Sequence, residues 1–321
     1  MRSRAYRKGE LEAEDFPLAD VSDHLAQPDT IVWVDLCNPD AAQLEQLKDE
    51  LGLHELAVED ALEPHQRPKL DHYEKHIFLS CHIVQLDADH VTLDKTEIDA
   101  FVGDRWFITV RKGDELDIDT VVQRWDRSHA LATCGVPFLL YGLLDVVADS
   151  YFTVIDQFDE YYEKVSDDLF DEHPLDPASQ RERFQARQSL VMLHRLVNGL
   201  REAVSSLLRR DDAVPSELDP YFEDVYDHLL RANEMTDSLR ELVTTIVETN
   251  LSLRDFRQNQ IMKQVTSWAA IIAVPTLITG YYGMNVKYPG LNTTWGWIVS
   301  VVVMLACSIG LFFLFRKKGW L

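Results

Sequence analysis

The residues with the clearest chemical potential lie near the end of an uncharged stretch of the chain. No Asp, Glu, Lys or Arg occurs among the 23 residues between Lys263 and Lys287, and Gly283, Met284 and Asn285 close that run. An asparagine carboxamide accepts hydrogen bonds from metal-bound water without the tight hold of a carboxylate. A hydrated metal ion that keeps its water presents water molecules rather than the bare ion, so a carboxamide such as that of Asn285 could contact it through those waters. Gly283 would let the backbone turn and bring carbonyl groups close to the ion.

Other kinds of chemistry lack their usual patterns. The sequence has no nucleophile elbow, no Walker loop, no GxGxxG and no metal-ligand triad, so we predict that the protein is not an enzyme. The four cysteines are scattered without ligand spacing, which indicates unpaired thiols in a reducing compartment: Cys37, Cys81, Cys134 and Cys307.

The charges divide the chain into two parts. Residues 261–321 contain no Asp or Glu and five basic residues, so this part carries +5. The whole chain carries −23, which leaves −28 on the preceding 260 residues. A protein that binds nucleic acid phosphates shows the opposite balance, so we exclude nucleic acid as a partner. The two parts are suited to two different solvents, water and lipid.

Two uncharged stretches are long enough to cross a bilayer, which takes about 20 residues as a helix. They predict a first span over residues 261–285 and a second over 295–316, joined by an outer loop over 286–294. A basic tail, residues 317–321, follows the second span, and Arg316, Lys317 and Lys318 lie at its end. By the positive-inside rule, both termini face the cytoplasm of a plasma-membrane protein.

The part before the spans predicts a cytoplasmic α/β domain followed by long helices. Residues 1–135 mix β-rich runs with helical runs, and Gly103-Asp104 is typical of a tight hairpin turn. Residues 136–260 are helical in pattern, with expected helices over 137–170, over 177–210 and from Pro220 onward. No proline occurs from Tyr221 to Val274, so the last helix is expected to enter the first span without a break. The predicted fold class is an α+β membrane protein.

The last helix carries an apolar seam with steps of three and four residues. Such a seam is buried either against helices of the same chain or, nearer the membrane, against other copies of the chain. Its members are Phe222, Val225, Leu229, Ala232, Thr236, Leu239, Val243, Ile246, Asn250 and Leu253.

These features together resemble the CorA family of divalent-cation channels. Gly283-Met284-Asn285 lies at the outer end of the first of two C-terminal spans, after a long helix and before a short loop. Residues 54–62 and 65–69 are similar to the family's N-domain signature, and residues 221–228 to the start of its stalk helix. The resemblance covers roughly residue 30 to the end of the chain. It implies a funnel-shaped homopentamer in the bilayer that passes magnesium, with the first spans lining the pore.

The resemblance also implies roles for particular residues. Gly283, Met284 and Asn285 would form the selectivity filter, and Asn259 a second carboxamide ring at the cytoplasmic end, although Asn259 is equally well read as a solvated stalk residue. Asp60 and Asp224 match a regulatory magnesium site between subunits, which would hold the pore shut when cytoplasmic magnesium is abundant. Small or apolar residues would line the pore, and Val265 and Ala273 would gate it by dewetting, with Thr276 and Gly280 beyond them.

One departure from the family pattern leaves open that the transported ion is not magnesium. Many relatives carry an acidic outer loop, whereas residues 286–294 here contain Lys287 and no acid. This loop leaves room for a zinc transporter of the ZntB type, or for cobalt or nickel, while the intact Met284 favours magnesium. A membrane-anchored sensor that conducts nothing is a further alternative.

Overall fold

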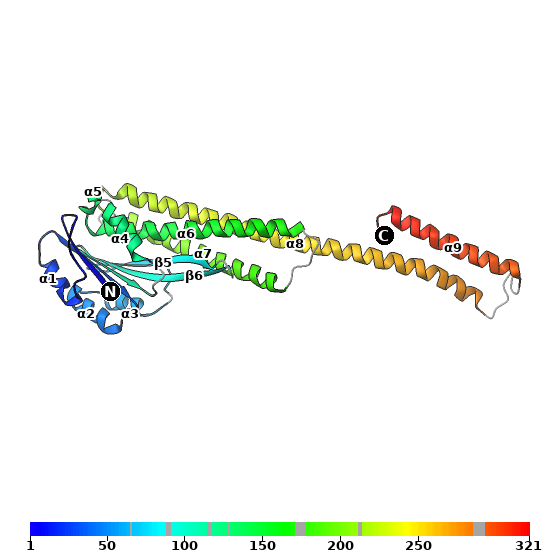
Figure 1. The fold of residues 1–321 in the computed structure, drawn as a ribbon, viewed down its shortest axis with the longest axis horizontal. Coiled ribbons are helices and arrows are strands. Elements are labelled where there is room, and N and C mark those ends of the chain that lie inside the picture. Colours follow the sequence, from blue (N-terminus) through cyan, green and yellow to red (C-terminus); the bar gives the residue numbers. More distant parts are fainter. Residues whose placement is uncertain are drawn as a thin grey trace. The chain divides into compact units, whose positions relative to one another are not determined.

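The chain forms two compact units in the computed structural model (Figure 1). The structure describes residues 1–64, 66–87, 91–113, 117–127, 129–170, 177–210, 214–284 and 293–321. The first unit comprises Met1–Thr244 and the second Thr245–Leu321.

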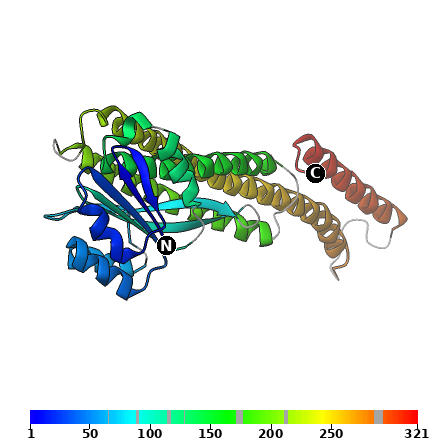
Figure 2. The same cartoon turned by 60° about the vertical axis from the view of Figure 1, so that its left-hand side comes forward.

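A seven-stranded mixed sheet lies in the first unit (Figure 2). Its spatial order is β2-β1-β3-β7-β6-β5-β4; β3 and β7 are parallel and the other neighbours antiparallel. The predicted turn at Gly103-Asp104 joins two of these antiparallel strands, β6 and β7. The strands are β1 (Arg2–Arg7), β2 (Glu10–Glu14), β3 (Thr30–Cys37), β4 (Lys69–His72), β5 (Ile77–Asp87), β6 (Thr92–Val102) and β7 (Trp106–Arg111).

Short helices cover one face of this sheet and long helices the other. Because side chains alternate along a strand, Val32 and Val34 of β3 point into a core with α1 (Val21–Leu25), α2 (Ala41–Leu51) and α3 (Glu55–Leu62). Trp33 points to the opposite face, where its ring lies 4.8 Å from that of Trp125 in α4 (Ile118–Arg127). A single turn, α5 (His129–Ala132), precedes the long α6 (Val136–Asp167), which packs on β5.

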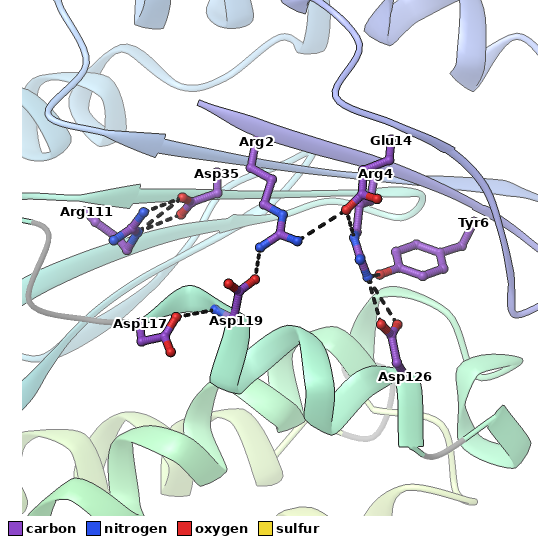
Figure 3. Close-up of polar contacts among 9 residues, drawn as sticks. All are labelled: Arg2, Arg4, Tyr6, Glu14, Asp35, Arg111, Asp117, Asp119 and Asp126. Carbon is purple, nitrogen blue, oxygen red and sulfur yellow. Dashed lines mark hydrogen bonds and ion pairs between the residues drawn. The ribbon is translucent and has the colours of Figure 1, made fainter.

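Ion pairs fasten the sheet to α4 and its central strands to each other (Figure 3). Arg4 of β1 donates to Glu14 at 2.8 Å and to Asp126 of α4 at 3.1 Å. Between the parallel strands, Arg111 of β7 donates to the buried Asp35 of β3 at 2.7 Å. The arginine side chain is 9% exposed and the aspartate 2%, so each neutralises the other where water does not reach.

Three described helices are long and apolar enough to cross a membrane: α6, α8 (Asp219–Tyr282) and α9 (Thr294–Lys317). The apolar part of α6 is largely buried inside the first unit, so α6 is a core helix of that unit. The corresponding parts of α8 and α9 are exposed. Lipid is the solvent that suits such surfaces, which agrees with the two predicted spans.

The part of the apolar seam that lies in the first unit, from Phe222 to Val243, is buried against other helices of the same chain. Phe222 of α8 lies 6.1 Å from the ring of Tyr141 in α6, and Thr236 lies 3.2 Å from His194 in α7 (Pro177–Leu208). The seam is buried from Phe222 through Val243 in a single copy. Of the two alternatives for this part of the seam, burial within the chain is therefore correct. Asn250 and Leu253, in the second unit, are only half-buried.

Candidate functional site

The end of α8 presents two different faces within the second unit. One face is half-buried and turned toward α9: Ser267 is fully buried, and the ring of the adjacent Trp268 lies 6.5 Å from that of Phe312 in α9. At 3.6 residues per turn, the predicted pore residues fall within an arc of about 120° on the other side of the helix. All are solvent-accessible in the single chain: Asn259, Val265, Ala273, Thr276 and Gly280.

Polar side chains on this stretch of α8 bond to their own backbone. The Thr276 hydroxyl donates to the carbonyl of Ile272 at 2.9 Å, and that of Thr279 to the carbonyl of Thr276 at 3.0 Å. Pro275 lies inside the helix and has no N–H, so the helix leaves the carbonyl of Ile271 without its usual donor. The exposed face is therefore nearly apolar, with small side chains, and the freed carbonyl of Ile271 lies on the opposite side of the helix.

Gly283 and Met284, the first two residues of the predicted filter motif, form a tight turn at the end of α8. The amide of Gly283 donates to the carbonyl of Thr279 at 2.9 Å, and that of Met284 to Tyr281 at 3.3 Å. A Cβ atom at position 283 would lie 3.0 Å from the Thr279 carbonyl oxygen, which makes the position too close for most side chains. A side chain here would crowd the Thr279 carbonyl, whereas the backbone of Gly283 is not left-handed. Asn285 and the predicted loop residues up to Asn292 lie outside the described residues.

Asp60, one half of the predicted regulatory pair, stands near the end of α3 and is already paired. Its Oδ2 accepts a hydrogen bond from Lys69 of β4 at 2.6 Å, and the same ammonium lies 3.0 Å from Asp71. Burial lowers the pKa of Lys69, but its bonds to Asp60 and Asp71 outweigh burial and leave that pKa raised. The lysine therefore stays charged at neutral pH.

A buried cluster of charged side chains, Lys112, Glu97 and Asp99, contacts the backbone at the end of α3 through its lysine. Lys112 donates to the backbone carbonyls of Asp60, at 3.2 Å, and Glu63, at 2.5 Å. It also pairs with Glu97 and, at 3.1 Å, with Asp99, both on β6. Burial raises the pKa of Asp99 to about 6, against the lowering effect of Lys112. The cluster fixes the segment that carries Asp60 to the centre of the sheet.

Asp224, the other half of the predicted pair, lies on an exposed part of α8. Its Oδ1 lies 3.8 Å from Nε2 of His228, one turn further along the helix. Among the described residues no hydrogen bond or ion pair joins Asp60 to Asp224. Within the single chain the two acids have separate partners, Lys69 for Asp60 and His228 for Asp224.

Sequence reasoning missed Lys69, Lys112 and the acidic pair beneath α3. One signal was available: Glu97 and Asp99 are two apart in a β-rich run, so both point to the same face of the sheet. Two carboxylates buried on the same face of a strand need a cation nearby to offset their charge. Lys112 directly follows β7, the next strand in the chain, and so was a candidate for that cation. That Lys69 pairs with Asp60 depends on the placement of β4, which the sequence did not predict.

Comparison with known proteins defines the class of this chain. Residues 28–317 match the family model described as CorA-like Mg2+ transporter protein, so the chain belongs to this family of membrane transporters, which are not enzymes. The cobalt/magnesium transport protein CorA of Thermotoga maritima is 29% identical over 317 residues, covering 97% of this chain and 90% of that protein.

Solved structures share the fold over the whole chain. The complete CorA magnesium transporter of Methanocaldococcus jannaschii has a TM-score of 0.79 and 23% identity, covering 99% of this chain and 98% of that one. The full-length CmaX protein has a TM-score of 0.77 and 19% identity, covering 100% and 98%. The predicted α/β domain, long helices and apolar C-terminal helices are thereby confirmed.

Proposed function

We propose that this protein is a passive magnesium channel of the plasma membrane, formed by five copies around a pore lined by α8. One observation carries the proposal. The end of α8 has one half-buried face, next to Trp268 and its contact with Phe312 of α9, and a second, exposed face of small and apolar residues, where the predicted pore residues lie. Two spans are too few to enclose a pore, so an ion would cross at an axis between copies. The relatives named for magnesium transport support the choice of ion.

Selection would take place at the outer end of α8. Five copies of Asn285 would accept hydrogen bonds from the waters of a hydrated ion, with Gly283 and Met284 completing the filter. Asn259 would form a second ring at the cytoplasmic end, and its exposure in the single chain fits that position. Between the rings, Val265 and Ala273 would close the pore by dewetting, and Thr276 and Gly280 would line the rest.

Feedback would act through Asp60 and Asp224 of neighbouring subunits. Two carboxylates that approach across an interface repel each other unless a cation lies between them. Bound magnesium would therefore stabilise a closed ring, and loss of the ion would loosen it. Asp224 is exposed and has no lysine or arginine within salt-bridge distance among the described residues, so it is accessible to such an ion.

The proposed arrangement places residues 1–135 and the helical region 136–260 in the cytoplasm. The pore span would run over 261–285, the outer loop over 286–294, the second span over 295–316 and the basic tail over 317–321. Both termini would then be cytoplasmic, because Arg316, Lys317 and Lys318 follow the second span.

A second candidate is transport of zinc, cobalt or nickel, with zinc coupled to protons as in a ZntB-type protein. Lys287 favours it, because a ring of five lysines at the outer mouth would repel cations that are driven by potential alone. Intact Met284 favours magnesium.

The deciding experiment is ion flux through purified protein in liposomes that contain a metal-sensitive dye. Mg²⁺, Co²⁺, Ni²⁺ and Zn²⁺ are offered one at a time, with protein-free liposomes as the control. We expect magnesium to enter without a proton gradient. Zinc entry that requires a proton gradient would favour the second candidate, and no entry of any ion would indicate a sensor.

A further inference from the structure

Asp60, the acid that the proposed feedback assigns to magnesium, already holds a cation of the chain's own. The Lys69 ammonium lies 2.6 Å from Asp60 Oδ2 and 3.0 Å from Asp71 Oδ2, so one charge bridges two carboxylates from two elements. The Asp60 side chain is 25% exposed and that of Lys69 is 32% exposed. Both charges are therefore within reach of ions from solution.

The lysine is held in place by the sheet. Lys69 pairs with Ser80 across β4 and β5, and its ammonium lies 5.6 Å above the ring of Phe78. Asp71 is two residues further along β4, on the same face of the strand. Because Lys69 is only nine residues from Asp60 in the chain and anchored in a strand, its ammonium is present at the carboxylate whenever no other cation is there.

The surroundings have room and charge for a hydrated divalent ion. An open pocket of about 470 Å³ is lined by Glu59, Asp60, Asp71 and Lys69, together with Leu56, His72 and Tyr73. Six waters occupy about 180 Å³ at roughly 30 Å³ each, so a hydrated magnesium ion fits. Three carboxylates and one ammonium give the pocket a net charge of −2, whereas without the lysine it would be −3.

An ammonium and a metal ion compete for the same oxygen. The Asp60 oxygen that accepts from Lys69 at 2.6 Å is not available to a metal-bound water along the same direction, and two cations this close repel each other. When the ion takes Asp60, Lys69 keeps a partner, because Asp71 is within 3.0 Å of its ammonium. The exchange therefore leaves no ammonium without an anion.

We propose that Lys69 is a tethered competitor for magnesium at Asp60: it occupies the carboxylate in the metal-free chain, leaves it when the ion binds, and thereby weakens binding. This inference rests on the proposed feedback and names the residue that sets its concentration range. A sensor of cytoplasmic magnesium must empty at the millimolar level. A carboxylate that must release an ammonium before it binds magnesium has a lowered affinity for magnesium, while the ligands of the metal stay the same.

The test measures the magnesium concentration that half-protects the full-length protein from a protease, in detergent micelles. Removing one partner of a partly exposed ion pair changes binding by up to about 1 kcal/mol, or about fivefold. We expect Lys69→Gln to lower the half-protecting concentration about fivefold. Lys69→Arg keeps the charge and can bridge both aspartates, so its value should stay near that of the unmodified protein.

Lys48→Gln is the matched control, because Lys48 is also ion-paired in the first unit, to Glu45 of α2 at 2.7 Å, away from the pocket. It should leave the half-protecting concentration unchanged, which separates competition from a general change of charge. If magnesium protects the unmodified protein and Lys69→Gln gives the same value, the role of Lys69 is wrong while the feedback stands. If magnesium protects neither, the feedback fails and the inference fails with it.

Discussion

Asn285 has the most specific task of any single side chain in the proposed channel. Replacing it with alanine removes five carboxamides from the outer mouth, and an apolar ring offers no acceptor to metal-bound water. We expect magnesium flux through Asn285→Ala in liposomes to fall by at least about tenfold, the effect of losing 1.4 kcal/mol at the filter. The control is Asn292→Ala, a second asparagine before α9 that lies outside the motif and should keep normal flux. Normal flux through Asn285→Ala would remove the filter from the proposal.

Lys112 places one positive charge beside two acids that the sheet buries. The side chains of Glu97 and Asp99 are 6% and 0% exposed, and Lys112 also bonds to the backbone at the end of α3. Breaking a buried ion pair by removing one partner costs about 3–5 kcal/mol. We therefore expect Lys112→Met to lower the melting temperature of the purified protein by several degrees or more. Lys95→Met, at an exposed position on β6, should melt within about a degree of the unmodified protein.

Asp99 gives the first unit a defined response to pH. Its pKa is raised from 3.8 to about 6 in the folded chain, so the folded state binds the proton more tightly than the unfolded state. Ionisation of Asp99 therefore costs stability: the cost is absent below about pH 4, grows as the pH rises and is complete above about pH 6. From the size of the shift, this cost is at most about 3 kcal/mol.

The Asp99→Asn variant cannot ionise at this position and avoids that cost. Its melting temperature relative to the unmodified protein should rise as the pH goes from 4 to 7. Asp94→Asn, exposed on the same strand, should show no such trend. A constant difference for Asp99→Asn across this range would show that the pKa of Asp99 is not raised in the folded chain.

The helices were predicted more accurately than the sheet. Helices were expected over residues 137–170 and 177–210, and α6 and α7 cover Val136–Asp167 and Pro177–Leu208. Long apolar periodicities and prolines at their starts determine such elements locally. The strand order depends on contacts between distant residues, such as the parallel pairing of β3 with β7, and no local pattern encodes it.

Individual strands were missed where their residues look polar. β1 and β2 carry the charged residues Arg2, Arg4 and Glu14, which pair with one another and with α4 instead of marking a solvated loop. β6 begins at Thr92, well before the predicted turn at Gly103-Asp104, and its first residues form a partly exposed extension paired with β5. The position of Lys69 next to Asp60 likewise depends on the placement of β4 in the sheet, so it followed from the structure and not from the sequence.

The proposed feedback between subunits would be a property of the assembled protein. Asp224→Lys would place a fixed positive charge where the proposal puts magnesium, next to Asp60 of a neighbouring copy. The closed state should then form without the ion, so magnesium should no longer change the variant's sensitivity to protease. Glu234→Lys makes the same charge change at an exposed position further along α8 and should respond to magnesium like the unmodified protein. An Asp224→Lys variant that magnesium still protects would show that Asp224 is ordinary solvated surface.

Transport by this protein is expected to need no energy source other than the electrochemical gradient. The sequence contains no Walker loop or other nucleotide-binding pattern. A membrane potential of 100 mV is worth about 4.6 kcal/mol for a divalent ion, or roughly three decades of accumulation. The potential alone is therefore sufficient to drive uptake.

Magnesium uptake into protein-containing liposomes at controlled membrane potential tests the central claim most directly. Equal magnesium is placed on both sides at a micromolar concentration, well below the millimolar range in which the proposed feedback would close the pore, and the potential is set by a potassium gradient with a potassium ionophore. A potential that is negative inside should drive magnesium in through the unmodified protein, and uptake should stop when the potential is set to zero. Protein-free liposomes should take up none in either case. Uptake that continues at zero potential and follows an imposed proton gradient would contradict a passive magnesium channel.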